Sequence, residues 1–173
     1  MSSRKQTTKF LSKLLESSRL SGRGKYYAKE VTLDYGWKHP IRVDYMQFEP
    51  KNQLAVSGIE KGEFICFEVK SCKADFHSGN GLNFEGDKNY IVTTMECYKQ
   101  IVNEIDWNVG VMVAVPYSSN VTDEFENPTP IPKEYNFDAP EEYWRLHIIK
   151  NAHLINRKRS MAELLFCMLR AGR

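Results

Sequence analysis

Residues 63–72 read EFICFEVKSC, and this stretch decides how the rest of the chain is interpreted. Its phenylalanine, isoleucine, cysteine and valine residues are typical of a central strand with apolar side chains on both faces. Glu68 and Lys70 interrupt that pattern, and side chains two positions apart in a strand point to the same face of a sheet. An acid and a base therefore share a face that burial should keep apolar.

A third charged residue interrupts the strand expected before this one. Asp44 lies in RVDYMQF, so Asp44, Glu68 and Lys70 converge if the two strands are neighbours. Carboxylates buried together repel unless a cation lies between them, and Mg²⁺ is held by one or two carboxylates with waters and substrate phosphates. We expect Mg²⁺ or Mn²⁺ to bind Asp44, Glu68 and the backbone carbonyl of Val69. Lys70 would then hold or help to deprotonate the attacking water.

The residue types alone also allow a simpler interpretation. Glu68 and Lys70 can form a salt bridge on an edge strand, and Asp44 can cap a turn. Charged residues are common at the ends of strands, so both interpretations stay open at this point.

Hydrophobic periodicity predicts the other elements, working outward from this strand. The chain is expected to begin with a flexible tail, residues 1–8, because these residues are polar. The predicted elements are a helix over 9–20, a hairpin with strands in 26–37 and 41–50, a helix over 90–105, a strand over 109–116, a strand or hairpin over 145–155, and a helix over 160–173 with Ser160 as N-cap.

This order predicts a single α/β domain over residues 1–173, with a core of order αβββαβ and a C-terminal helix. A strand, a helix and a strand between 64 and 115 imply a parallel pair joined by a crossover. The central sheet is therefore expected to be mixed and flanked by helices. Residues 117–142 are acidic and rich in proline and asparagine, which predicts a surface insertion or a lid.

The composition indicates where the protein acts and the state of its cysteines. No apolar run is long enough to cross a membrane and the first residues do not resemble a signal peptide, so we expect a cytoplasmic protein that does not bind membranes. The four cysteines lack the spacing of a zinc site, so we expect reduced thiols.

Charge is unevenly distributed along the chain. Residues 1–29 hold eight lysines and arginines and one acid, residues 145–173 hold seven and one, and residues 30–144 hold nine and twenty. Two basic arms around an acidic centre suit a polyanion held over a metal site. Solvated helix faces and a flexible tail explain the same distribution.

The pattern of an acid followed by Glu-x-Lys on consecutive strands, after an N-terminal helix, resembles the PD-(D/E)XK nuclease superfamily. In that resemblance Asp44 matches the first acid, Glu68 the second and Lys70 the lysine, whereas Val43 stands where the motif has proline. The likeness covers residues 9–116. It implies a restriction-endonuclease-like fold and hydrolysis of phosphodiester bonds in DNA by a metal-activated water.

The segments EVKSCKADF, GDKNY and VGVMVAVP, with the basic C-terminal end, are similar to the small MmcB-type DNA repair nucleases of bacteria. This likeness implies that Asp75 supports the metal ligands and that Lys88 contacts a phosphate. Several members of the superfamily also use an acid of the first helix as a metal ligand. Glu16 holds that position here, although the favoured interpretation from the residues is an exposed partner for a nearby lysine such as Lys13.

The basic arms are expected to contact DNA phosphates without reading the base sequence. The side chains concerned are Arg4, Lys5, Lys9, Lys13, Arg19, Arg23, Lys25, Arg157, Lys158, Arg159, Arg170 and Arg173. Two other classes of function stay open. One is a catalytically silent nucleic-acid-binding module on the same fold. The other is a protein-interaction role, or a homodimer, through the 117–142 loop.

Overall fold

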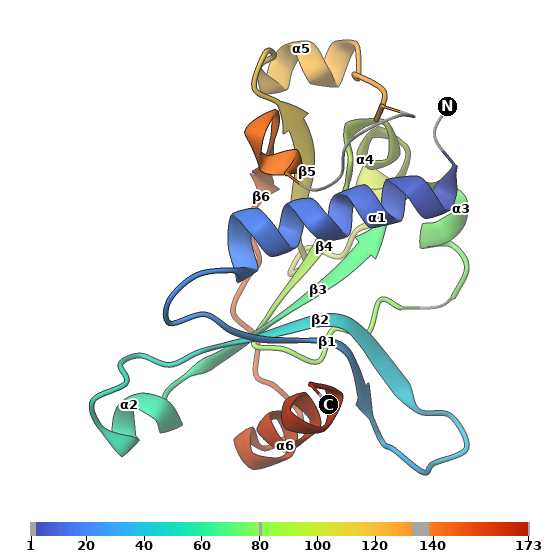
Figure 1. Cartoon of the computed structure of the whole chain (residues 1–173). Coiled ribbons are helices and arrows are strands. Elements are labelled where there is room, and N and C mark those ends of the chain that lie inside the picture. The colour runs from blue at the N-terminus through green and yellow to red at the C-terminus, as the bar shows by residue number, and fades with distance from the viewer. Residues whose placement is uncertain (1–2, 80, 133–138, 173) are drawn as a thin grey trace.

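The computed structural model describes residues 3–79, 81–132 and 139–172, and in that portion of the chain six strands form one sheet (Figure 1). The strands lie side by side in chain order: β1 (Tyr26–Leu33), β2 (Ile41–Glu49), β3 (Glu63–Lys70), β4 (Lys88–Thr94), β5 (Gly110–Pro116) and β6 (Trp144–Lys150). Strands β1 to β3 are antiparallel, β3 to β5 are parallel, and β6 is antiparallel to β5. The predicted α/β class with a central mixed sheet is confirmed.

Helices flank the sheet on both sides, and the predicted C-terminal helix is present. They are α1 (Arg4–Leu15), α2 (Val56–Glu60), α3 (Lys73–Phe76), α4 (Met95–Ile101), α5 (Val121–Glu126) and α6 (Met161–Ala171). Helix α1 continues into a π-helical turn, and two short 3-10 turns cover 102–104 and 140–142. Figure 1 shows α1 on one face of the sheet and α6 on the other. Within the described residues, no helix is long and apolar enough to cross a membrane.

Strand β3 supplies both halves of the core because its side chains alternate between faces. Phe67 and Val69 are buried in the cluster that contains the apolar stripe of α1, whereas Phe64 and Cys66 pack in the cluster that contains α6. Glu68 continues the second series. It therefore points to the α6 side of the sheet, beyond the apolar cluster on that side.

The predicted helix over 90–105 is half wrong. Residues 88–94 form β4, which is parallel to β3, and α4 begins only at Met95 with Thr94 as its N-cap. The run YIVTT consists of a tyrosine and four β-branched residues and is almost entirely buried, which favours a central strand over a helix. The crossover from β3 therefore reaches β4, and α4 joins β4 to β5.

The expected flexible tail is also wrong for the residues from Arg4 onward. Helix α1 begins there because Ser3 and Gln6 form a capping box: Ser3 Oγ accepts from Gln6 N at 3.3 Å, and Gln6 Oε1 accepts from Ser3 N at 2.8 Å. The start of this helix consequently holds Arg4 in a defined position beside the end of β3.

The 117–142 segment carries α5, and its residues 133–138 lie outside the described residues. Ile131 is buried in the core cluster under α1, so the segment is not wholly a surface insertion. At the C-terminus the Ser160 N-cap is confirmed, with Ser160 Oγ accepting from Glu163 N at 3.2 Å.

Candidate active site

A cleft of about 980 Å³ opens at the carboxyl end of β3. Pairing between β2 and β3 stops at Tyr45 and Phe67, so the two strands separate just beyond this pair, between Asp44 and Glu68. The described lining comes from the start of α1, the β1–β2 hairpin, the end of β3 and the loop after α3: Arg4, Thr8, Glu30, Thr32, His39, Pro40, Ile41, Arg42, Asp44, Val69, Lys70, Asp75, Gly79, Gly81 and Asn83.

Asp44 spans the point where the strands separate. Its Oδ2 atom accepts a hydrogen bond from the backbone N–H of Val69 at 2.9 Å. This side-chain bond links β2 and β3 beyond the point where their backbone hydrogen bonds end. The carboxylate is half-buried and lines the cleft. One carboxylate is thus fixed in orientation and still faces the cleft.

Glu68 is fully buried, and no described donor reaches either of its carboxylate oxygens with hydrogen-bond geometry. Burial raises the pKa of Glu68 to about 8, and the nearby Asp44 carboxylate adds to the effect. The charge of Lys70 opposes it, as does the Asn83 backbone N–H, which lies close to Glu68 without good hydrogen-bond geometry. Buried carboxylates without partners are rare in native proteins because they lose their hydration without compensation. This group is therefore a strong candidate for chemistry.

The glycine-rich loop after α3 packs directly on this pair of charges. Gly81 has φ of +65°, and a Cβ atom there would lie 2.5 Å from Oε2 of Glu68 and 3.1 Å from Nζ of Lys70. Only glycine accommodates both the backbone conformation and the close approach. Asn83 then ties the loop to the hairpin, since its Nδ2 atom donates to the backbone oxygen of Arg42 at 2.9 Å.

Asp75 belongs to the same site, at its edge. Its Oδ2 atom accepts from the backbone and hydroxyl of Ser71, at 3.0 and 2.9 Å, and its Oδ1 atom pairs with Arg4. Burial alone would raise the pKa of Asp75, but the Ser71 hydrogen bonds and the charges of Lys70 and Arg4 outweigh burial and lower it. Asp75 is therefore an anion that fixes the end of β3 and the Arg4 guanidinium.

The structure brings together five residues that the sequence predicts for the site: Asp44, Glu68, Val69, Lys70 and Asp75. Glu16 lies near them, in a cavity of about 190 Å³ that Asp44 also lines. Its carboxylate is occupied, however, by the Tyr45 hydroxyl and by Lys29 Nζ, both at 2.7 Å. Among the described residues no cluster of three His, Cys, Asp or Glu side chains could hold a metal ion.

Several predicted phosphate-binding side chains are engaged elsewhere. Lys88 lies at the start of β4, away from the cleft, and pairs with Glu63 at 2.7 Å. Arg157 pairs with Asp87 at 2.9 Å. Arg159 pairs with three carboxylates, those of Asp34, Glu85 and Glu163. Outside the cleft lining also lie Arg19, Arg23, Lys25 and Lys158.

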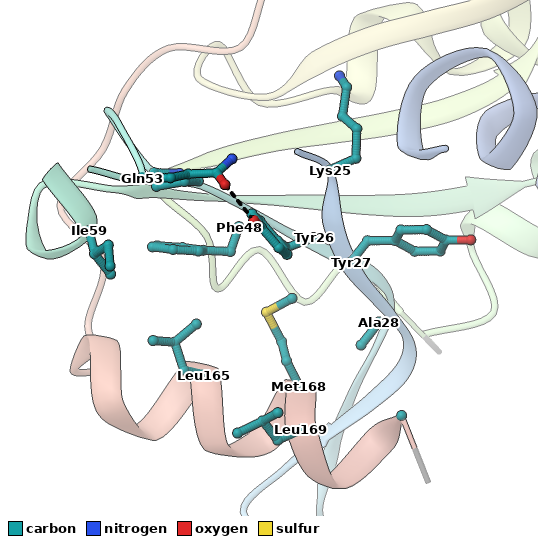
Figure 2. A pocket seen from close by; sticks show the side chains of 12 residues that line it. Lys25, Tyr26, Tyr27, Ala28, Phe48, Gln53, Ile59, Leu165, Met168 and Leu169 are labelled. Atoms are coloured by element: carbon teal, nitrogen blue, oxygen red, sulfur yellow. Dashed lines mark hydrogen bonds between the residues drawn. The ribbon is translucent and has the colours of Figure 1, made fainter. Parts of the chain in front are cut away.

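A second hollow, of about 710 Å³, lies between α6 and the outer strand of the sheet (Figure 2). Figure 2 shows Leu165 and Met168 of α6 facing Phe48 of β2 across it, and at its rim the Tyr26 hydroxyl donates to Gln53 at 2.8 Å. Its described lining includes no carboxylate, histidine or cysteine. The cleft at the end of β3 is therefore the candidate active site.

The charged residues of this candidate site are predictable from the sequence, whereas the residues that position them are not. The two closely spaced glycines, Gly79 and Gly81, are the sequence feature that points to the loop covering Glu68. Ser71, Arg42 and Asn83 carry no sequence signal, because their contacts depend on the fold.

Comparison with known proteins gives the fold but no family. No family model matches the chain, and no curated protein matches it. Among solved structures, the SPO1766 protein of unknown function from Silicibacter pomeroyi aligns with a TM-score of 0.52 and 16% sequence identity, over 93% of this chain and 80% of that chain. At this level of identity the likeness concerns the fold alone.

Proposed function

We propose that the protein is a metal-dependent nuclease that hydrolyses phosphodiester bonds in DNA. The observation that carries the proposal is Glu68, a fully buried carboxylate without a hydrogen-bond partner among the described residues, set between Asp44 and Lys70 beside a large cleft. The choice of DNA follows from the resemblance to the PD-(D/E)XK nucleases.

The residues present fit a divalent cation. Asp44 and Glu68 supply two carboxylates, and the backbone carbonyl of Val69 is a further oxygen donor on the same strand. Mg²⁺ favours such oxygen ligands and completes its shell with waters and substrate phosphates, so a site with two carboxylates is sufficient. A bound cation would supply Lewis-acid stabilisation of the charge that develops on the phosphate and would lower the pKa of the attacking water.

The side chains of the site would position the cation, the attacking water and the DNA backbone. Asp44 is held in place by the Val69 N–H, and Glu68 must lose its proton before it can bind a cation. Lys70, buried on the same face as Glu68, is placed to hold the attacking water or a phosphate oxygen. The Asp75 anion keeps Arg4 at the mouth of the cleft, where a guanidinium can contact the DNA backbone.

The test is a cleavage assay of the purified protein on single-stranded, duplex, flap and junction DNA and on single-stranded RNA. We expect cleavage of at least one DNA with Mg²⁺ or Mn²⁺ and none in EDTA, and the panel reports the preferred shape and polymer. Absence of cleavage of every substrate with both metals would contradict the proposal.

A further inference from the structure

The turn of the β1–β2 hairpin, residues 34–40, projects beyond the rest of the sheet (Figure 1). Its sequence is DYGWKHP, and His39 and Pro40 line the cleft itself. Trp37, two residues away from His39, is 76% exposed. A large aromatic side chain therefore stands in solvent, two residues along the chain from the lining of the candidate active site.

The turn that contains Trp37 is held by contacts with α6 and with Arg159 just before it. Arg159 donates to both carboxylate oxygens of Asp34, at 2.9 and 2.8 Å, and Trp37 N donates to Asp34 O at 3.0 Å. Arg170 lies over the Tyr35 ring at 4.6 Å. Asp34 and Tyr35 thus contact the body of the protein and fix the backbone of the turn, while the Trp37 side chain stays exposed.

Basic side chains line the cleft beyond Trp37, among carboxylates that offset part of their charge. Lys38 and His39 follow it directly and are exposed, and Arg42 lies on the same wall of the cleft, paired with the exposed Glu30 at 3.1 Å. On the opposite side Arg4 is held by Asp75. An aromatic platform beside cations along one groove is the arrangement that binds single-stranded nucleic acid, with bases stacked on rings and phosphates near the cations.

We propose that Trp37 stacks on an unpaired base of the nucleic acid bound in the cleft, an inference that rests on the proposed nuclease function. The substrate class is then single-stranded DNA, or duplex DNA with an unpaired segment close to the scissile phosphate. The seven residues from Trp37 to Asp44 span at most about 25 Å, so the stacked base lies within several nucleotides of the metal-binding carboxylates. In an intact duplex the base faces are already stacked, so they are closed to Trp37.

Binding, rather than cleavage, tests this inference. Fluorescence anisotropy of a labelled 12-nucleotide single strand and of a blunt duplex is measured with wild type and variants in EDTA. Trp37→Ala is expected to weaken single-strand binding by about 5- to 100-fold and duplex binding by less than about twofold. Trp37→Phe is expected to retain most of the affinity, because a phenyl ring still stacks.

The chain supplies a matched control in Trp107, which is 72% exposed but precedes β5, at the opposite end of the parallel strands from the cleft. Trp107→Ala is expected to bind both DNAs as wild type does, and binding should quench tryptophan emission in Trp107→Ala but not in Trp37→Ala. Equal single-strand affinity of the two variants, or equal loss on single strand and duplex in Trp37→Ala, would overturn the inference. So would the absence of any binding to the single strand by wild type.

The outcome separates this inference from the nuclease proposal. Stacking through Trp37 without cleavage in any metal would leave the inference standing for a DNA-binding cleft and remove the nuclease. Metal-dependent cleavage with identical binding by Trp37→Ala and Trp107→Ala would keep the nuclease and remove the stacking role. A thermal melt confirms that Trp37→Ala is folded.

Discussion

Each end of β3 carries a glutamate, and the two glutamates differ in their surroundings. Glu63, at the start of the strand, binds Lys51 at 2.6 Å and Lys88 at 2.7 Å, and hydrogen bonds from these two lysines lower its pKa. Glu68, five residues on, is buried without a hydrogen bond from any described residue, and its pKa is raised to about 8. A carboxylate that only supports the fold is paired. A buried carboxylate without such partners destabilises the fold, and the proposed function explains why the chain retains it.

The largest effect that separates the two ends is expected in catalysis. Glu68→Gln or Lys70→Ala should lower the rate of metal-dependent cleavage by on the order of 10² to 10⁴, because each removes a group at the reacting centre. The measurement is the single-turnover rate at saturating metal. Glu63→Gln, the same substitution at the other end of the strand, should stay within about threefold of wild type. Equal losses in Glu63→Gln and Glu68→Gln would remove the distinction.

The next largest effect is expected from the loop that packs on Glu68. Gly81→Ala places a methyl group 2.5 Å from Oε2 of Glu68, and displacement of a catalytic group by about 1 Å can cost on the order of 100-fold in rate. Gly79→Ala is the matched control: Gly79 also has a left-handed φ, of +72°, but a Cβ there meets no described atom within 4 Å. Both variants should lose about 1 to 2 kcal/mol of stability, and only Gly81→Ala should lose activity. Similar activities for the two variants would contradict the described packing.

Stability should respond to pH with opposite signs at the two ends. Because the pKa of Glu68 is raised from 4.5 to about 8, the folded state holds a proton that the unfolded state releases, so stability falls as pH rises from about 4.5 to 8. Glu68→Gln removes this loss and should be more stable than wild type at pH 8 by a few kcal/mol. Glu63 has a lowered pKa, so its contribution is present at neutral pH and is lost in acid, and Glu63→Gln should be less stable than wild type at pH 8.

Denaturant unfolding at pH 4.5 and pH 8 measures both differences. Mg²⁺ should raise the midpoint of wild type at pH 8 but not that of Glu68→Gln, because only a protein that binds the ion gains stability from it. A Glu68→Gln variant that is less stable than wild type at pH 8 would show that the carboxylate has a stabilising partner.

The smallest expected effect concerns Lys88, which the resemblance places at a phosphate. The structure pairs Lys88 with Glu63, so Lys88→Ala should lower the free energy of unfolding by less than about 1 kcal/mol and leave DNA affinity unchanged. Anisotropy binding with Arg4→Ala in parallel provides the comparison, since Arg4 lines the cleft. A loss of DNA affinity in Lys88→Ala as large as that in Arg4→Ala would restore Lys88 to the binding surface.

The charged residues at the centre of the candidate site can be picked out from the sequence, because each places a charge in a strand that is otherwise apolar. Asp44, Glu68 and Lys70 each interrupt an apolar strand, and neighbouring strands bring such residues together. Strand β4 cannot be separated from α4 by hydrophobic periodicity. A strand buried on both faces shows no alternation of polar and apolar residues, so YIVTT reads as part of the helix that follows it.

The partners of the basic residues could not be predicted, because they lie far away in the sequence. Arg157 meets Asp87, and Arg159 meets Asp34, across separations of 70 and 125 residues. Local charge patterns give no sign of such pairs, so the basic C-terminal arm was assigned to phosphates. In the fold, Arg157 and Arg159 instead form ion pairs that stabilise the β1–β2 hairpin and the loop before β4.

The most direct test of the central claim is the cleavage rate of three proteins on the best substrate: wild type, the Asp44→Asn, Glu68→Gln double variant, and Glu63→Gln. The account predicts cleavage by wild type and Glu63→Gln with Mg²⁺ or Mn²⁺, none in EDTA, and none above background by the folded double variant. Cleavage by the double variant at the wild-type rate would contradict it.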